Sequence, residues 1–251
     1  METLRGRVIY GVDGRSDYAL ALLDERLLFE VGADSDQALE AAVQQGHGRI
    51  GPEDLGALPI VDFELMLAHF CIGNFGDVVG HNITCGSCRK IFGVEFSLRT
   101  YIGALTAEIV KHDAPDFRGA PLALPTRDMI RNADEKSDLV GLVWKNKTPP
   151  MPEDLSALET YLERACPVLE EDIKAACPGC ATEQSFHFAL RDWITAKLKA
   201  RLKALLAQIH ILATTYHWRF DEILALSRQT RSALIGTIRN QGARSMPGGR
   251  G

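Results

Sequence analysis

Two C-x-x-C pairs constrain this chain more than any other feature of its sequence. The first is Cys85-Gly86-Ser87-Cys88 and the second is Cys177-Pro178-Gly179-Cys180. The two intervening residues of each turn let both sulfurs point into one concavity, so each turn supplies one edge of a tetrahedron. Four thiolates arranged in this way are a typical ligand set for structural zinc. We therefore predict that Cys85, Cys88, Cys177 and Cys180 bind one structural zinc ion, with no coordination position left open for catalysis.

The segments around the two pairs repeat one pattern. Apolar residues alternate on both sides of the first pair, at Val79, Ile83, Phe92, Val94, Phe96 and Leu98. This alternation predicts a β-hairpin that carries two thiols at its tip. Beyond the second pair, the apolar positions six, eight and ten residues after the last cysteine recur as Phe186, Phe188 and Leu190. The sequence thus predicts two similar half-sites on paired hairpins, separated by a longer insertion than the ~15–20 residues usual between such pairs.

Other interpretations of the cysteines stay open at this point. A thioredoxin-like redox site needs its C-x-x-C at a helix N-terminus, whereas strands are expected after both pairs here. Four thiolates also suit iron–sulfur binding, and the pairs could instead be buried without metal. His81 and His187 flank the turns as candidate replacement ligands or supporting groups, although strand histidines more often only pack. Cys71 and Cys166 stand alone and are expected in the core.

Charge is distributed unevenly along the 251 residues. The net charge is −5, but the segment from Lys197 onward has ten basic and two acidic residues, so it carries +8 and the preceding residues carry −13. This distribution excludes a uniformly basic nucleic-acid binder and predicts an acidic body with a basic C-terminal arm. The arm either docks on an acidic protein surface or nucleic acid, or is only a solvated helix face.

Several function classes have no signature in the sequence. Apolar runs are shorter than the ~20 residues that span a bilayer. The first residues, Met1-Glu2-Thr3-Leu4-Arg5, lack the pattern of a signal peptide, so we expect a protein that is cytoplasmic at synthesis. There is no G-x-S-x-G, no phosphate-binding glycine loop and no H-E-x-x-H. We therefore expect no enzyme, no membrane segment and no small-molecule substrate.

The expected fold class is α+β, with a zinc-ribbon-like pair of β-hairpins, a helical insertion and a C-terminal helical arm. Residues 1–57 are expected to form a small mixed α/β segment with a strand at 8–12 and helices at 17–28 and 34–43. Residues 58–190 are expected to form the zinc-stapled body. It would contain a helix at 63–75 capped by Asp62, hairpins near 78–98 and 173–190, and the insertion 99–172. Residues 191–240 are expected to form the basic helical region, and 241–251 a disordered tail.

The C-terminal region carries the longest amphipathic pattern. Apolar residues recur three or four positions apart from Ile194 to Tyr216. If the apolar face docks into a groove of another protein, the candidate partner-binding residues are Leu198, Leu202, Leu205, Ile209, Leu212, Tyr216 and Trp218. The alternative is that this stripe packs on the chain's own body, as most amphipathic helices do.

Short blocks in a fixed order also carry a family resemblance. They are Leu58-Pro59, Phe75-Gly76-Asp77, Leu124-Pro125-Thr126-Arg127-Asp128-Met129, and the C-terminal Ile209-His210-Ile211-Leu212-Ala213-Thr214-Thr215-Tyr216-His217-Trp218 with Glu222-Ile223-Leu224-Ala225-Leu226. Together with the two C-x-x-C turns, they resemble the T-even phage baseplate hub and hub-assembly family. Relatives of this family occur in contractile tails and phage-tail-like injection systems. The resemblance runs from about Leu58 to Asn240.

The resemblance implies a non-enzymatic component that builds or joins the baseplate at the tip of a contractile tail. Its partners would be other baseplate or hub proteins, and the chain would either be incorporated in a phage or phage-tail-like particle or leave after assembly. The family's cysteine pairs correspond to Cys85/Cys88 and Cys177/Cys180. The chain departs from the family at Arg219, where a small capping residue is usual. The alternative function is a zinc-ribbon nucleic-acid-binding or transcription adaptor, which the hydrophobic strands after the turns disfavour.

Overall fold

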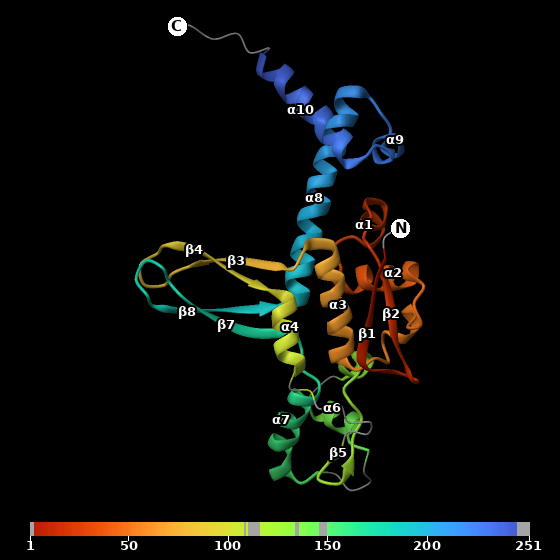
Figure 1. Ribbon diagram of the computed structural model, residues 1–251, viewed down its shortest axis with the longest axis vertical. Coiled ribbons are helices and arrows are strands. Elements are labelled where there is room, and N and C mark those ends of the chain that lie inside the picture. Colours follow the sequence, from red (N-terminus) through yellow and green to blue (C-terminus); the bar gives the residue numbers. More distant parts are fainter. Residues whose placement is uncertain (1–2, 108, 110–115, 134–135, 146–149, 245–251) are drawn as a thin grey trace. The chain divides into compact units, whose positions relative to one another are not determined.

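The computed structural model describes residues 3–107, 109, 116–133, 136–145 and 150–244 (Figure 1). Within these residues the fold is α+β, as the sequence predicts, and it combines helices with four two-stranded antiparallel sheets. The chain divides into two compact units, Met1–Leu22 with Ser35–Ile194 and Leu23–Asp34 with Thr195–Gly251. Among the described helices, none combines the length and the apolar character needed to cross a bilayer.

The first unit begins with a hairpin of β1 (Thr3–Val12) and β2 (Arg15–Ala21), and α2 (Ser35–Gly46) packs on β2. Asp13 and Gly14 connect the strands with φ angles of 47° and 74°. Two positive φ angles are typical of the tight type I′ turn, which the Asp-Gly sequence favours. The helix predicted at 17–28 is therefore wrong over its first part, because strand pairing from the Asp-Gly turn extends through Ala21.

Helix α3 (Ile60–Phe75) forms the centre of the first unit and is buried on nearly all sides from Ile60 to Cys71. Asp62 is fully buried in its first turn, while Pro59 occupies the N-cap position. The Asp62 carboxylate does not cap the helix as predicted. It accepts backbone N–H groups of β1, from Ile9 at 2.8 Å, Tyr10 at 3.0 Å and Gly11 at 2.7 Å.

This contact explains two features of the N-terminal region. The register of β1 against β2 breaks between Arg7 and Val12, and the N–H groups freed there bond to Asp62. Since β1 packs on α3, residues 1–22 and 35–57 belong to the same unit as the helices and hairpins that follow, whereas residues 23–34 belong to the second unit. The observed division of the chain into two units therefore differs from the expected one, in which residues 1–57 form a separate segment. A short 3-10 helix η1 (Pro52–Asp54) leads from this region toward α3.

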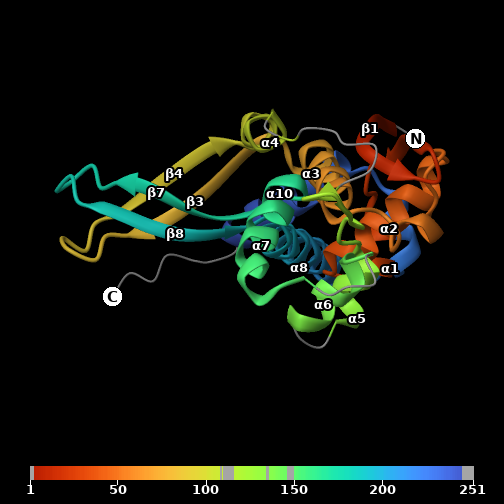
Figure 2. The same cartoon turned by 90° about the horizontal axis from the view of Figure 1, so that it is seen from below.

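Two long hairpins lie side by side and project from the helices of the first unit (Figures 1 and 2). One consists of β3 (Val78–Thr84) and β4 (Ile91–Ser97), and the other of β7 (Glu170–Ala176) and β8 (Glu183–Ala189). The two hairpins have matching registers, since Thr84 pairs with Ile91 and Ala176 pairs with Glu183 next to the cysteine turns. Each hairpin leads directly into a helix, α4 (Leu98–Ala107) or α8 (Leu190–Tyr216). The predicted hairpins are confirmed, with β7 beginning slightly earlier than expected.

The segment between the hairpins contains short elements. They are β5 (Asp116–Phe117), β6 (Ala120–Pro121), α5 (Arg127–Asn132), α6 (Lys136–Val143), η2 (Pro152–Asp154) and α7 (Leu155–Ala165). Thr126 caps α5 by accepting the Met129 N–H at 3.2 Å. A small core of Phe117, Leu122 and Leu158 holds this segment together. Figure 2 shows α5, α6 and α7 near one another.

The second unit is helical and draws on two distant parts of the chain. It contains α1 (Glu25–Val31), the larger part of α8, α9 (Phe220–Ala225) and α10 (Arg228–Arg244). Arg231 is only 1 % exposed; its guanidinium forms an ion pair with Glu25 and donates to the Leu226 carbonyl at 2.6 Å. Helix α10 extends to Arg244, beyond the expected start of the tail at residue 241, and residues 245–251 lie outside the described residues.

Candidate metal centre

The first C-x-x-C turn is closed by two backbone hydrogen bonds. The Cys85 N–H donates to the Lys90 carbonyl at 2.9 Å, and the Arg89 N–H donates to the Cys85 carbonyl at 3.0 Å. Arg89 has a φ angle of 63°, in the left-handed region that non-glycine residues seldom adopt. The backbone of this turn is therefore held in one specific loop at the tip of the β3–β4 hairpin.

The second turn repeats this construction at the tip of the β7–β8 hairpin. The Cys177 N–H donates to the Thr182 carbonyl at 3.0 Å, and the Ala181 N–H donates to the Cys177 carbonyl at 2.8 Å. Ala181 has a φ angle of 59°. The same two bonds and the same positive φ thus occur at equal distances from the first cysteine of each pair, although the intervening residues differ.

The four predicted cysteines meet between the two hairpin tips. The Cys85 Sγ lies 3.6 Å from the Cys180 Sγ, and the Cys88 Sγ lies 3.7 Å from the Cys177 Sγ. All four sulfurs lie within 4.8 Å of one another, so this cluster can hold a metal ion. No disulfide links them, since all four are free thiols.

Other contacts also join the two tips. The Gly86 N–H donates to the Gln184 Oε1 at 2.9 Å. A Cβ atom at Gly179 would lie 2.9 Å from the Lys90 Cδ and 3.6 Å from the Cys88 Sγ. The second turn therefore packs closely against the first, and a larger residue at Gly179 would require the flexible Lys90 side chain to move.

Burial differs within each pair. Cys85 and Cys177 are buried together with Ile83 and Phe92 in a small apolar core, whereas Cys88 and Cys180 are exposed. Each half-site thus contributes one inner and one outer sulfur. The inner sulfurs anchor the cluster to the hairpin core, and the outer ones close it toward solvent.

The hydrogen bonds around the sulfurs favour thiolates. The Cys88 N–H and the Gly179 N–H point at the sulfurs of Cys85 and Cys177, at 3.5 and 3.4 Å. Hydrogen bonding to Thr182, whose hydroxyl lies 3.4 Å from the Cys180 Sγ, lowers the pKa of the Cys180 thiol to about 6. The thiolate, and not the thiol, is the form of cysteine that coordinates a metal.

Crowding of the sulfurs acts in the opposite direction at Cys88. A backbone hydrogen bond from Lys90 lowers the pKa of Cys88, but hydrogen bonding to the Cys180 thiol, then loss of solvent, and then the thiols of Cys177 and Cys85 outweigh it and raise this pKa to about 11. Four thiolates at these distances repel one another, and a cation at their centre would remove that repulsion. The cluster is therefore arranged for a positive ion rather than for four negative charges alone.

Neither histidine near the turns belongs to the cluster. His81 stacks on Phe186, with the ring centroids 4.7 Å apart. His187 lies between Asp172 at 3.0 Å and Glu170 at 2.9 Å, both on β7. Cys71 and Cys166 are buried elsewhere in the first unit, as expected, and burial raises the pKa of Cys166 to about 12.

The predicted partner-binding stripe is mostly covered. Leu198, Leu205, Ile209 and Leu212 are buried, whereas Leu202, Tyr216 and Trp218 are half-buried. The rings of Tyr216 and Trp218 stack with centroids 4.8 Å apart. A partner would therefore meet only the half-buried members, and the buried four act in the packing of the chain itself.

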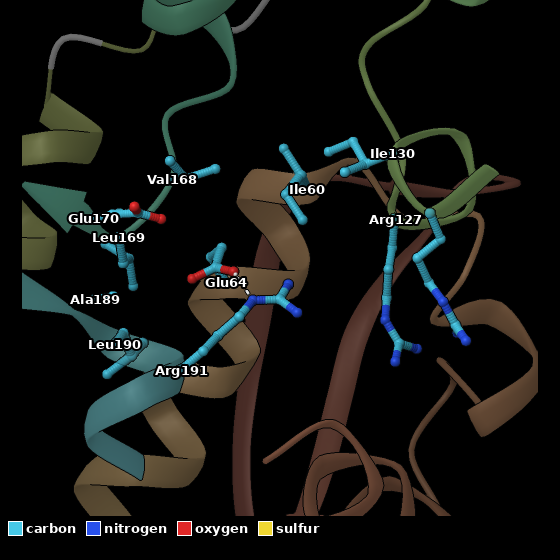
Figure 3. A pocket seen from close by; sticks show the side chains of 11 residues that line it. Ile60, Glu64, Arg127, Ile130, Val168, Leu169, Glu170, Ala189, Leu190 and Arg191 are labelled. Carbon is cyan, nitrogen blue, oxygen red and sulfur yellow. Dashed lines mark hydrogen bonds and ion pairs between the residues drawn. The ribbon is translucent and has the colours of Figure 1, made fainter. Parts of the chain in front are cut away.

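Sequence reasoning missed a network of charged groups around Phe63. Glu64, Arg127 and Arg191 also line a cavity of about 190 Å³. Figure 3 shows the Arg191–Glu64 pair on one side of this cavity and Arg127 on the other. The guanidinium carbons of Arg127 and Arg191 lie 4.7 and 4.9 Å from the centre of the Phe63 ring. Asp36 binds both arginines, at 2.8 and 3.1 Å.

This network has a structural role in the first unit. Arg191 binds Glu64 at 2.7 Å, and burial raises the pKa of Glu64 although Arg191 opposes the shift. The paired residues lie on α2, α3, α5 and the first turn of α8, far apart in the sequence. No local spacing could have revealed them, because each pair forms only when these helices pack together.

Comparisons with protein-family models, curated proteins and solved structures find no significant match to this chain.

Proposed function

We propose that the four-cysteine cluster binds a single zinc ion that cross-links the two hairpin tips. Zinc–sulfur bonds of about 2.3 Å in a tetrahedron place neighbouring sulfurs about 3.8 Å apart. Two sulfur separations between the hairpin tips, Cys85 to Cys180 at 3.6 Å and Cys88 to Cys177 at 3.7 Å, are close to that value. An iron–sulfur cluster holds its sulfide and iron atoms between the cysteines and would need them farther apart. The four thiolates fill the coordination sphere, so the ion has no open position for a substrate.

Elemental analysis of the purified chain tests the zinc directly. We expect one zinc per chain in the wild type and none in Cys88→Ser. Loss of the ion should unfold the hairpin tips, because structural zinc contributes roughly 10–16 kcal/mol in finger peptides. Ser87→Ala, in the same turn, is the matched control and should keep the metal. Full occupancy by iron, or a metal-free wild type with unchanged thermal stability, would refute the proposal.

We further propose that the protein is a non-enzymatic structural or assembly component of the baseplate hub of a contractile tail or contractile injection system. The observation that carries this proposal is the pair of matched cysteine turns, in the order and positions that the family resemblance requires. Hairpins joined by one ion, followed in the chain by a long basic helix, also suit a part that is held within a larger assembly. The partners would be other baseplate or hub proteins, and the chain would be incorporated in the particle.

A pull-down with intact contractile particles tests this role. We expect tagged wild-type chain to co-purify with sheath, tube or baseplate subunits, and the genes for these subunits to lie beside its own gene. Cys88→Ser should lose the association because the hairpin tips no longer hold their shape. A metal-loaded chain that binds no particle subunit would reject the baseplate role while leaving the zinc proposal intact.

The alternative, a zinc-ribbon adaptor for nucleic acid or transcription, receives less support from the surface of the hairpins. The exposed residues of β7 and β8 include Glu170, Glu171, Asp172 and Glu183, which repel phosphates. Lys174, the lysine of these two strands, is paired with Glu183 at 3.4 Å, so the exposed charge of this hairpin is mainly acidic. Binding whose logarithm falls linearly with the logarithm of salt concentration would support the adaptor, and we expect none at physiological salt.

A further inference from the structure

The first unit contains an acidic groove with an apolar lining. It has a volume of about 520 Å³ and is lined by residues of α4, α5, α7 and the start of β7, including Leu105, Ile130, Leu162 and Val168. Four glutamates also line it, Glu159, Glu163, Glu170 and Glu171, and no lysine, arginine or histidine lines it among the described residues. A smaller hollow shares Tyr101, Glu163 and Glu171 with this groove, with Arg164 as its one cation in the described part of the chain.

Three features of the groove indicate a missing partner. Ile130 and Val168 are 41 % and 44 % exposed, a large fraction for aliphatic side chains. The Tyr101 hydroxyl is buried beside the Glu171 carboxylate, which can accept its proton, and no donor among the described residues reaches the hydroxyl oxygen. Glu159 and Glu163 are exposed on α7 and form no ion pair within the part of the chain that the structure describes. An occupant with apolar and basic groups would satisfy all three.

Helix α8 presents a face with that chemistry. Lys199, Lys203 and Leu206 are exposed and lie within two turns of one another, with Ala200, Ala204 and Ala207 exposed beside them. Leu206 is 48 % exposed. No acidic residue occurs between Asp192 and Asp221, so nothing on this stretch of helix opposes the lysines. The small alanines would let the helix approach another surface closely.

We propose that this exposed face of α8 docks in the acidic groove of a second copy of the chain. Glu159 and Glu163 are four residues apart on α7, as Lys199 and Lys203 are on α8, so both pairs have the spacing of about 5–6 Å that one helical turn gives. Leu206 would contact the apolar lining, and a lysine ammonium would donate to the Tyr101 hydroxyl. The contact depends neither on the metal nor on the kind of particle.

The two surfaces differ, so the contact is head-to-tail. Such a contact leaves one free groove and one free α8 face at the ends of each assembly. Assembly therefore continues to a closed ring or an open filament. A symmetric dimer, in contrast, would use the same surface twice and would stop at two copies.

Sedimentation velocity on the full, metal-loaded chain tests this arrangement. The wild type should gain mass with protein concentration and lose it with added salt. The association constant should fall by roughly tenfold or more in Glu159→Lys/Glu163→Lys, and equally in Lys199→Glu/Lys203→Glu, because like charges then face each other. Mixing these two variants should restore association, since each retains the surface that the other has lost.

A variant that carries all four reversals should also self-associate, because its charges are exchanged rather than removed. The matched control is Glu40→Lys/Glu95→Lys, which changes net charge equally at exposed positions outside the groove. It should associate like the wild type. A wild type that stays monomeric at high concentration and low salt would overturn the proposal. So would association that survives both reversals, and a mixture that fails to recover although both variants keep wild-type helix content.

Discussion

At the scale of single residues, the Asp62 carboxylate connects strand β1 to helix α3. It accepts three consecutive backbone N–H groups where β1 loses its register with β2. Both oxygens are used, and the side chain is fully buried. The carboxylate thus replaces the strand that would otherwise satisfy this backbone, and it fixes β1 to the first turn of α3.

Replacing Asp62 with Ala should therefore destabilise the first unit strongly. Hydrogen bonds to a charged group contribute roughly 1.5–3 kcal/mol each, and the mutation leaves buried N–H groups unpaired. We expect a loss of about 3 kcal/mol or more in the free energy of unfolding, measured by urea titration. Glu95→Gln, at an exposed strand position, should cause almost no change and serves as the control.

His187 offers a prediction about pH. Hydrogen bonds to Asp172 and then to Glu170 raise the pKa of this imidazole, because both ring nitrogens donate when it is protonated. The stabilisation of the β7–β8 hairpin is fully present below the histidine's unfolded pKa and is lost as pH rises through the raised value.

Asp172→Asn with Glu170→Gln should shift the midpoint of the His187 titration downward, as followed by NMR of the ring protons. An unaltered His187 midpoint in the double variant would show that the carboxylates do not hold the proton.

At the scale of elements, the two hairpins are the part of the fold that the sequence predicts best. Alternation of Val79, Ile83, Phe92 and their counterparts is local, and strand pairing follows directly from it. The Asp13-Gly14 turn was an equally local signal that the sequence interpretation overlooked. The network of Arg127, Arg191 and Asp36 could not have been predicted, because it depends on tertiary packing alone.

The stability of the hairpin tips should depend on the bound ion, whereas the stability of α3 should not. Removal of metal by a chelator should increase amide hydrogen exchange in β3, β4, β7 and β8 by orders of magnitude, since the tips then lose their cross-link. Amides of α3, which is buried on nearly all sides, should exchange at their former rates. Uniform protection before and after chelation would mean that the cysteines stabilise nothing.

Adjacent leucines of α8 allow a matched comparison. Leu205 is 4 % exposed and Leu206 is 48 % exposed. Leu205→Ala should lower the free energy of unfolding by about 2–4 kcal/mol, because it leaves a cavity in packed surroundings. Leu206→Ala should cost less than about 0.5 kcal/mol in dilute protein. Circular dichroism during thermal unfolding measures both, and equal effects would contradict the packing of this helix.

At the scale of the whole molecule, the order of elements along the chain and their grouping in space diverge. Segment 23–34 belongs to the helical second unit, although it interrupts the first unit in the sequence. Sequence reasoning assigned it to an N-terminal segment because periodicity says nothing about long-range partners. The fold class and the cysteine cluster were predictable because each rests on short patterns. The assignment of α1 to the second unit was not predictable, because it depends on long-range contacts such as the ion pair of Arg231 with Glu25.

The grouping of α1 with the C-terminal helices has a consequence for the synthesis of the protein. Glu25 leaves the ribosome 206 residues before the arginine that pairs with it. At a synthesis rate of about 5–20 residues per second, α1 waits roughly 10–40 s for its partner helix. During that interval Phe29 also lacks Phe220, whose ring centroid later lies 5.1 Å from its own, so the nascent chain exposes an apolar segment until the C-terminal part of its unit has been made.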